Sequence, residues 1–364
     1  MTSKVTGPIS VIRIAIIGAG RVAQHYRKIL DSGLVTGFQI VGICDTDSDA
    51  ADGLASHWQC PAFESLLEMI EDIQPDLVLV LTPSGLHYSH ARTALELGCH
   101  VLVEKPVTLI PIDARELMKL AQVKNRMLGV AFQNRLNPAV SCLRDALQKG
   151  RFGQITTATI RLRWCRYQDY YEDGWHGTWA QDGGVINQQA IHHVDALNWL
   201  MGPVEAACAT MGNRLNRLEA EDTMVAVLRF ASGALGTIEA TTAARPCDIE
   251  ASLSVVGEGG LAVIGGIALN KVETWQFVDP WVEDEDAPIR YSREVPNGYG
   301  LSHGPLLQTT LNRLREGSTI APVSVEDCIA TGELVHALYS SFEIGGWVKL
   351  ADNPLSTKLG NGMK

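Results

Sequence analysis

The chain has 364 residues, of which 46% are hydrophobic, and this size predicts two domains. Its 30 basic and 41 acidic residues give a formal net charge of −11, which excludes nucleic acid as the main partner because the protein repels polyphosphates at long range. The sequence contains neither a long apolar run nor a signal-peptide pattern, so we expect a cytoplasmic protein without a membrane segment. No CxxC pair occurs among the eight cysteines, so we expect no metal site of zinc type and no disulfide framework.

A glycine-rich loop follows the first apolar run of the chain. Residues 12–17 read IRIAII and lead directly into GAGRVA, after which a helical segment and a second strand at 38–44 are expected. A G-x-G-x-x-A motif between a strand and a helix is typical of dinucleotide-binding βαβ units. The alternative is a glycine turn with a purely structural role. The first glycine permits the tight turn, the second lets backbone N–H groups approach a pyrophosphate, and the alanine allows close packing. The residues expected at the cofactor here are Gly18, Gly20, Arg21, Val22 and Ala23.

Asp45 follows the second strand, 25 residues after Gly20. A carboxylate at this position accepts hydrogen bonds from the adenosine ribose and repels a 2′-phosphate, so NAD is favoured over NADP as the cofactor. The alternative is that Asp45 only caps the next helix, as Asp47 or Ser48 could also do. Arg21 could reach a 2′-phosphate, which keeps NADP as the second choice.

Strands and helices then alternate along the first part of the chain. Strands at 77–81, 101–103 and 128–131 are separated by helices at about 84–97 and 110–124, which predicts an α/β Rossmann domain with a doubly wound parallel sheet. Ligands bind at the carboxyl ends of such strands, so the loops there should border the nicotinamide. These loop residues are Thr82, Pro83 and Ser84 after one strand and Glu104, Lys105 and Pro106 after the next. His87 either joins this site or is a buried side chain whose polar atoms are hydrogen-bonded within the protein.

The pattern changes after residues 134–138. Strand-like segments at 154–164, 204–211, 223–230, 234–242 and 249–256 follow one another with few helices between them, which predicts an α+β domain with an open, largely antiparallel sheet. Helices at 185–201, 304–317 and 324–346 can cover one face, and the other face suits a homodimer or homotetramer contact. The expected division is a Rossmann domain at 10–133, a substrate-binding and oligomerisation domain at 134–355 and a loose tail at 356–364.

The segment 181–202 reads QDGGVINQQAIHHVDALNWLMG. Its apolar spacing predicts one helix, on which Gln188 and His192 lie four residues apart and share a face. With the glycine motif and the Glu104-Lys105-Pro106 triplet, this segment makes the chain resemble the glucose-fructose oxidoreductase, inositol dehydrogenase and MocA (Gfo/Idh/MocA) family over nearly its whole length. The resemblance implies an NAD-dependent dehydrogenase that acts on CH–OH groups.

Oxidation of an alcohol needs a proton acceptor and a group that stabilises negative charge on the oxygen. The resemblance implies that Lys105 and His192 supply these functions, and either of them could be the immediate acceptor. The alternatives are a surface lysine paired with Glu104 and a histidine buried against the sheet. Gln188 stands where many family members carry aspartate, and an amide can orient a substrate but cannot act as a base. Ser84 likewise stands where the family commonly has asparagine.

The amide-bearing form of this segment is similar to the branch of the family that acts on sugars and nucleotide sugars, including the UDP-N-acetylglucosaminuronate 3-dehydrogenases. The resemblance therefore implies oxidation of a ring hydroxyl, at C3 of such a substrate. Aromatic and arginine side chains near residues 163–179 could stack on the sugar and pair with its anionic groups, or could serve domain packing. His176 stands where this branch would place an arginine. Inositol or free-sugar oxidation and a non-enzymatic dinucleotide-binding regulator are the other readings. The expected substrate contacts are Arg163, Arg166, Tyr171, Trp175, Trp179, Asn187, Gln188 and His192.

Overall fold

The computed structural model describes residues 11–361, which form two compact units. The first unit contains residues 11–131 together with 303–328, and the second contains residues 132–302 and 329–361. The first crossing lies close to the boundary predicted at 133. The return of 303–328 to the first unit differs from the prediction of two continuous domains, because hydrophobic residues of this late segment complete the core of the first unit.

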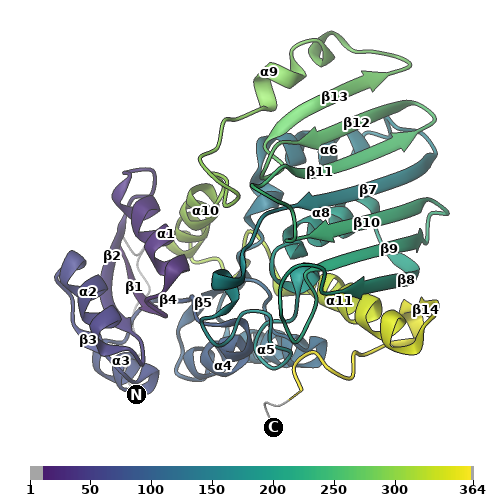
Figure 1. The fold of residues 1–364 in the computed structure, drawn as a ribbon. Helices are drawn as coiled ribbons and strands as arrows, with labels where there is room; N and C mark the ends of the chain where they lie inside the picture. The colour runs from purple at the N-terminus through teal and green to yellow at the C-terminus, as the bar shows by residue number, and fades with distance from the viewer. Residues whose placement is uncertain (1–10, 362–364) are drawn as a thin grey trace. The chain divides into compact units, whose positions relative to one another are not determined.

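A six-stranded, fully parallel sheet forms the centre of the first unit (Figure 1). Its order, β3-β2-β1-β4-β5-β6, reverses direction between β1 and β4, and this point in doubly wound sheets is where ligands bind. The predicted Rossmann architecture is therefore confirmed. The strands are β1 Ile12–Ile17, β2 Phe38–Cys44, β3 Ala62–Phe63, β4 Leu77–Val80, β5 His100–Val103 and β6 Leu128–Val130. The helices are α1 Arg21–Asp31, α2 Ser48–Trp58, α3 Leu66–Ile73, α4 His87–Glu96, α5 Pro111–Lys124 and α10 His303–Arg315, with the short 3-10 helix η1 at Ser84–Leu86.

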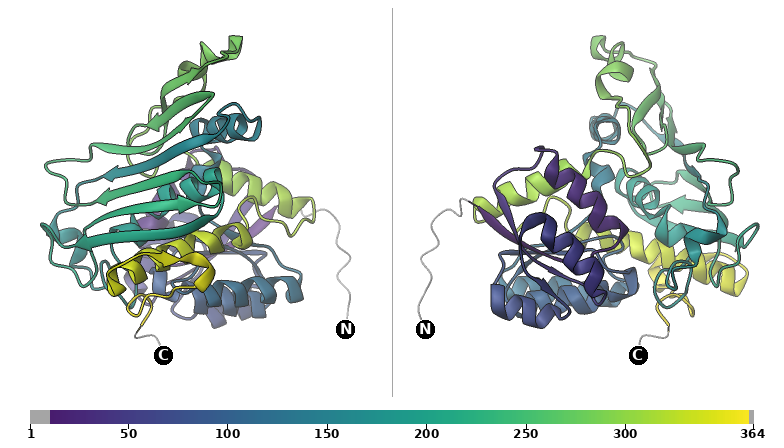
Figure 2. Two further views of the ribbon diagram at one scale, coloured as in Figure 1. Left: turned by 90° about the vertical axis from the view of Figure 1, so that its right-hand side faces the viewer. Right: turned by 60° about the vertical axis from the view of Figure 1, so that its left-hand side comes forward.

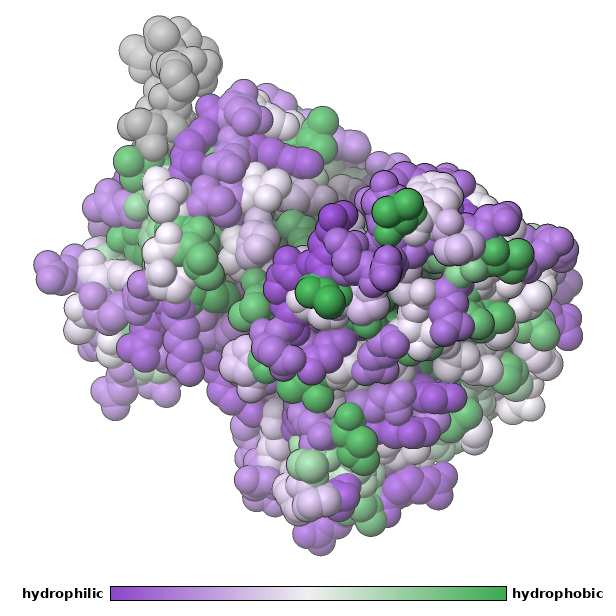
Figure 3. Space-filling view, turned by 90° about the horizontal axis from the view of Figure 1, so that it is seen from above, coloured by the Kyte–Doolittle hydropathy of each residue, from purple (hydrophilic) through white to green (hydrophobic). Residues whose placement is uncertain are grey.

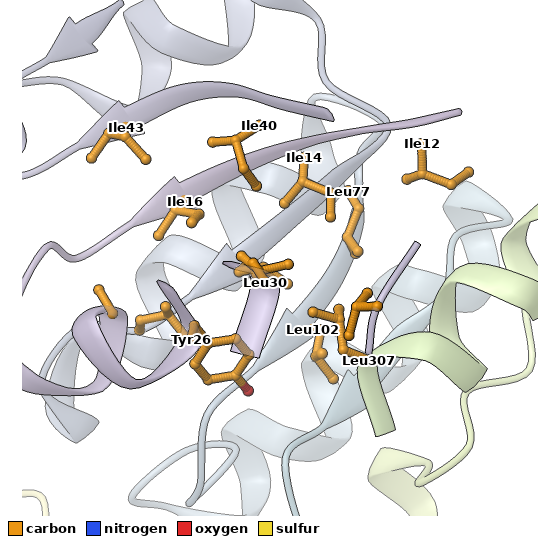
Figure 4. Packing of buried hydrophobic residues seen from close by; sticks show 14 of the residues in the cluster. Ile12, Ile14, Ile16, Tyr26, Leu30, Ile40, Ile43, Leu77, Leu102 and Leu307 are labelled. Atoms are coloured by element: carbon orange, nitrogen blue, oxygen red, sulfur yellow. The ribbon is translucent and has the colours of Figure 1, made fainter. Parts of the chain in front are cut away.

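The core of the first unit joins residues from both ends of the chain (Figure 4). Ile14 and Ile16 of β1 are completely buried, and Tyr26 of α1 is 1% exposed. Leu307 and Leu311 of α10, separated from them by nearly 300 residues, pack into the same cluster. Removal of this apolar surface from water fixes α10 against α1 and β1.

An eight-stranded sheet forms the second unit, in the order β13-β12-β11-β7-β10-β9-β8-β14. All of its pairs are antiparallel except that of β10 with β7, so the predicted open, largely antiparallel sheet is confirmed. The strands are β7 Ile155–Arg163, β8 Val204–Gly212, β9 Thr223–Phe230, β10 Leu235–Thr241, β11 Glu250–Gly257, β12 Gly260–Gly265, β13 Lys271–Phe277 and β14 Val348–Lys349. The helices are α6 Pro138–Gln148, α7 Val185–Gln188, α8 Ile191–Met201, α9 Ala287–Tyr291 and α11 Val325–Ile344.

One face of this sheet is covered by helices and the other is exposed. Helices α6 and α8 pack on one face, where they contact β12, β7 and β11 (Figure 1). On the other face alternate residues of β9 and β10 are exposed, among them Val225, Val227 and Leu235. Figure 2 shows this broad face without a covering helix from the described residues.

The end of the chain is held by hydrogen bonds up to the last described residues. The backbone N–H of Ser356 donates to His336 Nδ1 at 3.1 Å, and that of Thr357 donates to Glu343 Oε2 at 2.8 Å. Leu359 is only 2% exposed. Residues 356–361 thus differ from the expected loose tail because specific side chains of α11 bind them, and residues 362–364 of that tail lie outside the described residues.

The surface view in Figure 3 is mainly hydrophilic, with hydrophobic side chains in separate spots. Single exposed apolar residues of this kind are ordinary for folded proteins. Across residues 11–361, every helix is too short or too polar to cross a membrane.

Candidate active site

The glycine loop has the shape that a dinucleotide requires. Gly18 has φ +97°, and a Cβ atom there would lie 2.7 Å from the backbone carbon and oxygen of Leu81, so only glycine fits. Gly20 is the N-cap of α1, and a Cβ atom there would meet nothing within 4 Å. Open space at a helix N-terminus with exposed N–H groups suits a pyrophosphate. Ala23 is completely buried behind the loop, while Arg21 is exposed and Val22 is half-buried.

The open space at Gly20 leads to a prediction about Gly20→Ala. The protein offers no clash and the backbone has φ −76°, so the midpoint of thermal unfolding should change little. Affinity for NAD should fall at least tenfold, because the added methyl occupies the approach of the pyrophosphate. Isothermal calorimetry with Gly53→Ala as the control tests this, since Gly53 is an exposed α2 residue with equal free space. Unchanged NAD affinity in Gly20→Ala would show that the glycine loop does not contact the cofactor.

Asp45 ties the glycine loop to the end of β2. Its Oδ2 accepts the backbone N–H of Ala19 at 2.6 Å, and its Oδ1 accepts that of Asp47 at 3.0 Å. The cap of α2 is Asp47, whose side chain accepts the N–H of Ala50. Asp45 is therefore not the helix cap that the alternative required, and its carboxylate lies against the loop where a ribose is held in such folds.

The loops after β4 and β5 are braced by His87. Its two ring nitrogens lie 2.6 Å from the carbonyl oxygen of Pro106 and 2.8 Å from that of Thr82. The side chain is 1% exposed, and burial lowers its pKa, against the opposing effect of the two carbonyl groups. Ser84 beside it is also buried, at 3%. His87 thus holds the two loops together, which fits the buried alternative and fixes the positions of Thr82, Pro83 and Lys105.

Glu104 and Lys105 combine a buried carboxylate with a half-buried lysine at the end of β5. Tyr26 Oη donates to Glu104 Oε1 at 3.0 Å, and the Lys105 backbone N–H donates to Glu104 Oε2 at 3.2 Å. Burial alone would raise the pKa of Glu104, but hydrogen bonding and the charges of His303 and Lys105 lower it overall. An ionised carboxylate therefore lies next to Lys105 at the ligand-binding end of the sheet.

In the second unit the expected helix over 185–201 is two helices. α7 ends at Gln188, α8 begins at Ile191, and Gln189 and Ala190 form a turn between them. The prediction of one continuous helix face for Gln188 and His192 is therefore wrong, although both side chains flank the same turn. His192 is half-buried, with its ring 5.8 Å from that of Phe132 in an edge-to-face contact.

His193, next to the candidate base, has a structural role. It is 1% exposed, and burial lowers its pKa to about 4, so the imidazole is neutral at neutral pH. Its ring packs edge-on against Trp164 at 6.2 Å. Asn187 is buried as well and donates through Nδ2 to the carbonyl oxygen of Asp182 at 2.6 Å, which shapes the loop before α7.

A buried ion pair, which sequence patterns did not reveal, anchors α8. Arg135 donates to both oxygens of Asp195, at 2.8 and 2.7 Å, and Thr331 Oγ1 donates to Asp195 Oδ1 at 2.9 Å. The two charged side chains are 5% and 1% exposed. Asp195 lies three residues after His192, so this pair holds the helix that carries the candidate base.

Glu221 lies beneath the paired glycines before α7. It accepts the backbone N–H of Ile186 at 3.1 Å and the hydroxyl of Tyr339 at 3.2 Å. A Cβ atom on Gly184 would lie 2.2 Å from Glu221 Oε2, which explains the glycine at that position. Burial raises the pKa of Glu221 to about 8, so the carboxyl group is mostly protonated at neutral pH.

The raised pKa of Glu221 predicts how stability depends on pH. The folded state binds this proton more tightly than the unfolded state, so the stabilisation is complete below the ordinary pKa of 4.5 and is lost as pH rises through about 8. Each pKa unit of difference is worth about 1.4 kcal/mol. Urea unfolding of Glu221→Gln should show a much flatter decline of stability over this interval than the parent. Glu219→Gln, an exposed neighbour, is the control, and an equally steep decline in Glu221→Gln would contradict the assignment.

Both arginines expected to bind substrate already contact carboxylates. Arg163 donates to Glu239 at 2.6 Å and to Glu250 at 3.1 Å, and Arg166 donates to Asp248 at 3.0 Å. The structure thus places Arg163 in an ion-pair network on the sheet, and Arg166 in a pair beside the Trp164 ring at 5.1 Å. In this arrangement both guanidinium groups are already paired with carboxylates, so a substrate anion would have to compete for them.

The aromatic residues of the same region also have protein partners. Tyr171 Oη lies 2.7 Å from Thr242 Oγ1, and the Trp175 ring stacks on His176 at 3.6 Å. Trp179 meets Tyr339 edge-to-face at 5.1 Å. These contacts show that packing is one function of the aromatic stretch.

Two family models match consecutive parts of the chain. Residues 12–132 match the model described as the oxidoreductase family with an NAD-binding Rossmann fold. Residues 140–263 match the model of the GFO/IDH/MocA C-terminal domain. Together the two matches extend over most of both units.

Individual relatives resemble the chain at moderate identity. The WlbA dehydrogenase from Chromobacterium violaceum, solved with NADH and UDP-GlcNAcA, is 32% identical with a TM-score of 0.87, over 95% of this chain and 98% of that one. D-glucoside 3-dehydrogenase of Escherichia coli is 33% identical over 53% of this chain and 55% of that protein, little more than half of its length. UDP-N-acetylglucosamine 3-dehydrogenase of Acidithiobacillus ferrooxidans is 31% identical over 37% of this chain and 41% of that protein.

Proposed function

Because the chain belongs to the Gfo/Idh/MocA oxidoreductase family, we propose that it is an NAD-dependent dehydrogenase that oxidises the C3 hydroxyl of a nucleotide sugar of the UDP-N-acetylglucosaminuronate kind. The observation that carries this proposal is the similarity of nearly the whole chain to a dehydrogenase solved with NADH and UDP-GlcNAcA. Two relatives matched over shorter stretches are named as sugar 3-dehydrogenases, which supports the choice of C3.

The first unit would hold the cofactor through residues that fit a dinucleotide. Gly18 and Gly20 would admit the pyrophosphate at the N-terminus of α1, and Asp45 would accept the ribose hydroxyls. The loops after β4 and β5 would border the nicotinamide end. NAD, when bound, supplies the acceptor for the hydride that leaves the substrate carbon.

Three side chains would handle the substrate hydroxyl. Either His192 or Lys105 would take its proton, because an imidazole and an amine can both act as a general base. Lys105 would stabilise the negative charge that develops on the oxygen, as a cation in a partly buried position. Gln188 would orient the sugar by hydrogen bonding, since an amide cannot accept the proton.

Oxidation of a neutral sugar is the second candidate function, and one observation favours it. Arg163 and Arg166, the expected ligands for a uronate or a diphosphate, are paired with Glu239, Glu250 and Asp248. An enzyme for a free sugar or an inositol needs no arginine for an anion. On the nucleotide-sugar reading, the substrate anion would have to displace Asp248 from Arg166 or use other donors.

The exposed face of the eight-stranded sheet supports a further part of the proposal, self-association. Its apolar residues Val225, Val227 and Leu235 are 47%, 42% and 59% exposed, and they alternate along their strands with buried residues. A second copy would cover them. Light scattering of the purified protein and of Val227→Glu measures this association directly.

A substrate panel tests the proposed function. Formation of NADH by the purified protein is compared for UDP-N-acetylglucosaminuronate, UDP-N-acetylglucosamine, free hexoses and myo-inositol, with NADP as a cofactor control. Turnover restricted to the nucleotide uronate supports the first proposal, and turnover restricted to neutral sugars supports the second. Binding of NAD without oxidation of any of these compounds would contradict both.

A further inference from the structure

Four titratable side chains meet behind the Glu104-Lys105 segment, all of them in the first unit. His303, the first residue of α10, has Nδ1 3.3 Å from His25 Nε2 and Nε2 3.7 Å from Glu104 Oε1. Tyr26 Oη donates to the same carboxylate oxygen at 3.0 Å. α1, α10 and the end of β5 thus contribute to one connected polar cluster within an otherwise apolar core.

The cluster leads from the protein interior towards the solvent. Glu104 and His303 are 7% and 3% exposed, whereas His25 is half-buried. The His25 and His303 rings are 4.8 Å apart at 78°, and the Tyr26 ring lies 5.6 Å from that of His303. His303 therefore lies between the Glu104 carboxylate and the His25 imidazole, with the Tyr26 ring packed beside it.

His303 is chemically suited to pass a proton along this series. An imidazole can accept a proton on one ring nitrogen and release a different proton from the other. In His303 one nitrogen faces a carboxylate and the other faces a second imidazole. Tyr26 is completely buried and its pKa is raised well above the ordinary value by burial and by Glu104, so it serves as a fixed donor to the carboxylate.

We propose that Glu104, His303 and His25 form a proton relay that carries the proton released at Lys105 to the solvent. This inference rests on the proposed function, because oxidation of an alcohol to a ketone transfers a hydride to NAD and leaves one proton. Lys105, as a neutral amine, takes that proton from the substrate hydroxyl, and the resulting ammonium passes a proton to the Glu104 carboxylate, which gives it to His303 Nε2. His303 then releases its Nδ1 proton to His25 Nε2, and His25 gives a proton to water.

The charges around the relay support this direction. Burial and the charges of His303 and Lys28 together lower the pKa of His25 to about 4, against the opposing effect of Glu104. A group with so low a pKa holds a proton only briefly before solvent takes it. At the inner end, the lowered pKa of Glu104 keeps the carboxylate ionised, so it holds no proton of its own when one arrives, and the backbone N–H of Lys105 donates to it.

A purely structural cluster that joins α1 to α10 makes different predictions from a relay. His303→Gln keeps a polar side chain that can bridge Glu104 and His25, but an amide cannot exchange protons in this way. His25→Gln, at the half-buried end, tests the relay with less risk to folding. His57→Gln is the matched control, since His57 pairs with Asp31 at 2.9 Å on the surface of the same unit.

The first readout does not depend on turnover. Bound NAD carries a positive nicotinamide and NADH does not, so a proton-sharing network at this end of the sheet should release part of a proton when NAD binds. Calorimetry in two buffers of different ionisation enthalpy measures that release. The relay predicts a loss of at least half of it in His303→Gln and His25→Gln and no change in His57→Gln, whereas equal release in all four proteins overturns the relay.

The second readout uses the substrate that the panel identifies. We expect kcat to fall about tenfold or more in His303→Gln, with an altered pH profile and a changed solvent deuterium isotope effect. A fall in kcat with the same pH profile and isotope effect would mean a structural role only. If the parent protein oxidises no sugar, the proposed function fails, while the calorimetric result still decides on proton sharing in the relay.

Discussion

Lys105→Met is expected to abolish sugar oxidation while leaving the affinity for NAD within about twofold of the parent. The methionine keeps the length and apolar stem of the side chain, so the end of β5 should retain its structure. What is lost is the cation that stabilises negative charge on the substrate oxygen, an interaction that strengthens in the transition state. Loss of one such group typically lowers kcat by about 10² to 10⁴.

Steady-state kinetics and NAD titration of the same preparation measure both quantities. Lys119→Met is the matched control, because Lys119 is an exposed lysine on α5 of the same unit. Turnover of Lys105→Met within about threefold of the parent would exclude the lysine from the mechanism. Loss of NAD binding together with turnover would instead indicate that Lys105 holds the cofactor.

Arg135→Met is expected to destabilise the second unit by about 3–5 kcal/mol, the usual cost of leaving one partner of a buried ion pair without its counter-charge. Asp195 is 1% exposed, so water cannot replace the two hydrogen bonds that Arg135 donates to it. The loss also frees α8, the helix on which His192 lies. We therefore expect lower activity at temperatures well below the unfolding midpoint.

Urea unfolding followed by circular dichroism tests this prediction. The double variant Arg135→Met with Asp195→Leu removes both charges and should recover a large part of the stability, since the cost comes from the unpaired carboxylate. Arg290→Met is the control, because it breaks an exposed pair with Asp286 and should shift the midpoint very little. Equal effects of Arg135→Met and Arg290→Met would contradict the account of the buried pair.

The first unit was predictable because its patterns are local. β1 is an apolar strand apart from Arg13, and it leads into a loop where Gly18 is required by the approach of Leu81. The membership of α10 in this unit was not predictable, because its apolar spacing shows that it packs but not which of two cores it joins. The break between α7 and α8 was missed for a similar reason, since apolar residues at helical spacing occur on both sides of the turn at Gln189 and Ala190.

The candidate site was predictable where residue type alone defines the chemistry. Lys105, Asp45 and the glycines follow strands whose ends bind ligands. Partners far apart in the chain could not be predicted. Arg166 looked free for a substrate anion, but Asp248 pairs with it across 82 residues. His303 likewise gains its position in the relay only because α10 packs beside α1.

The central claim is that the chain removes a hydride from C3 of a nucleotide sugar. UDP-N-acetylglucosaminuronate that carries deuterium only at C3 can be incubated with the purified protein and NAD, and the NADH analysed by mass spectrometry. The account predicts deuterium in the NADH and a slower initial rate than with the unlabelled compound. Unlabelled NADH, formed at the same rate from both compounds, would contradict it.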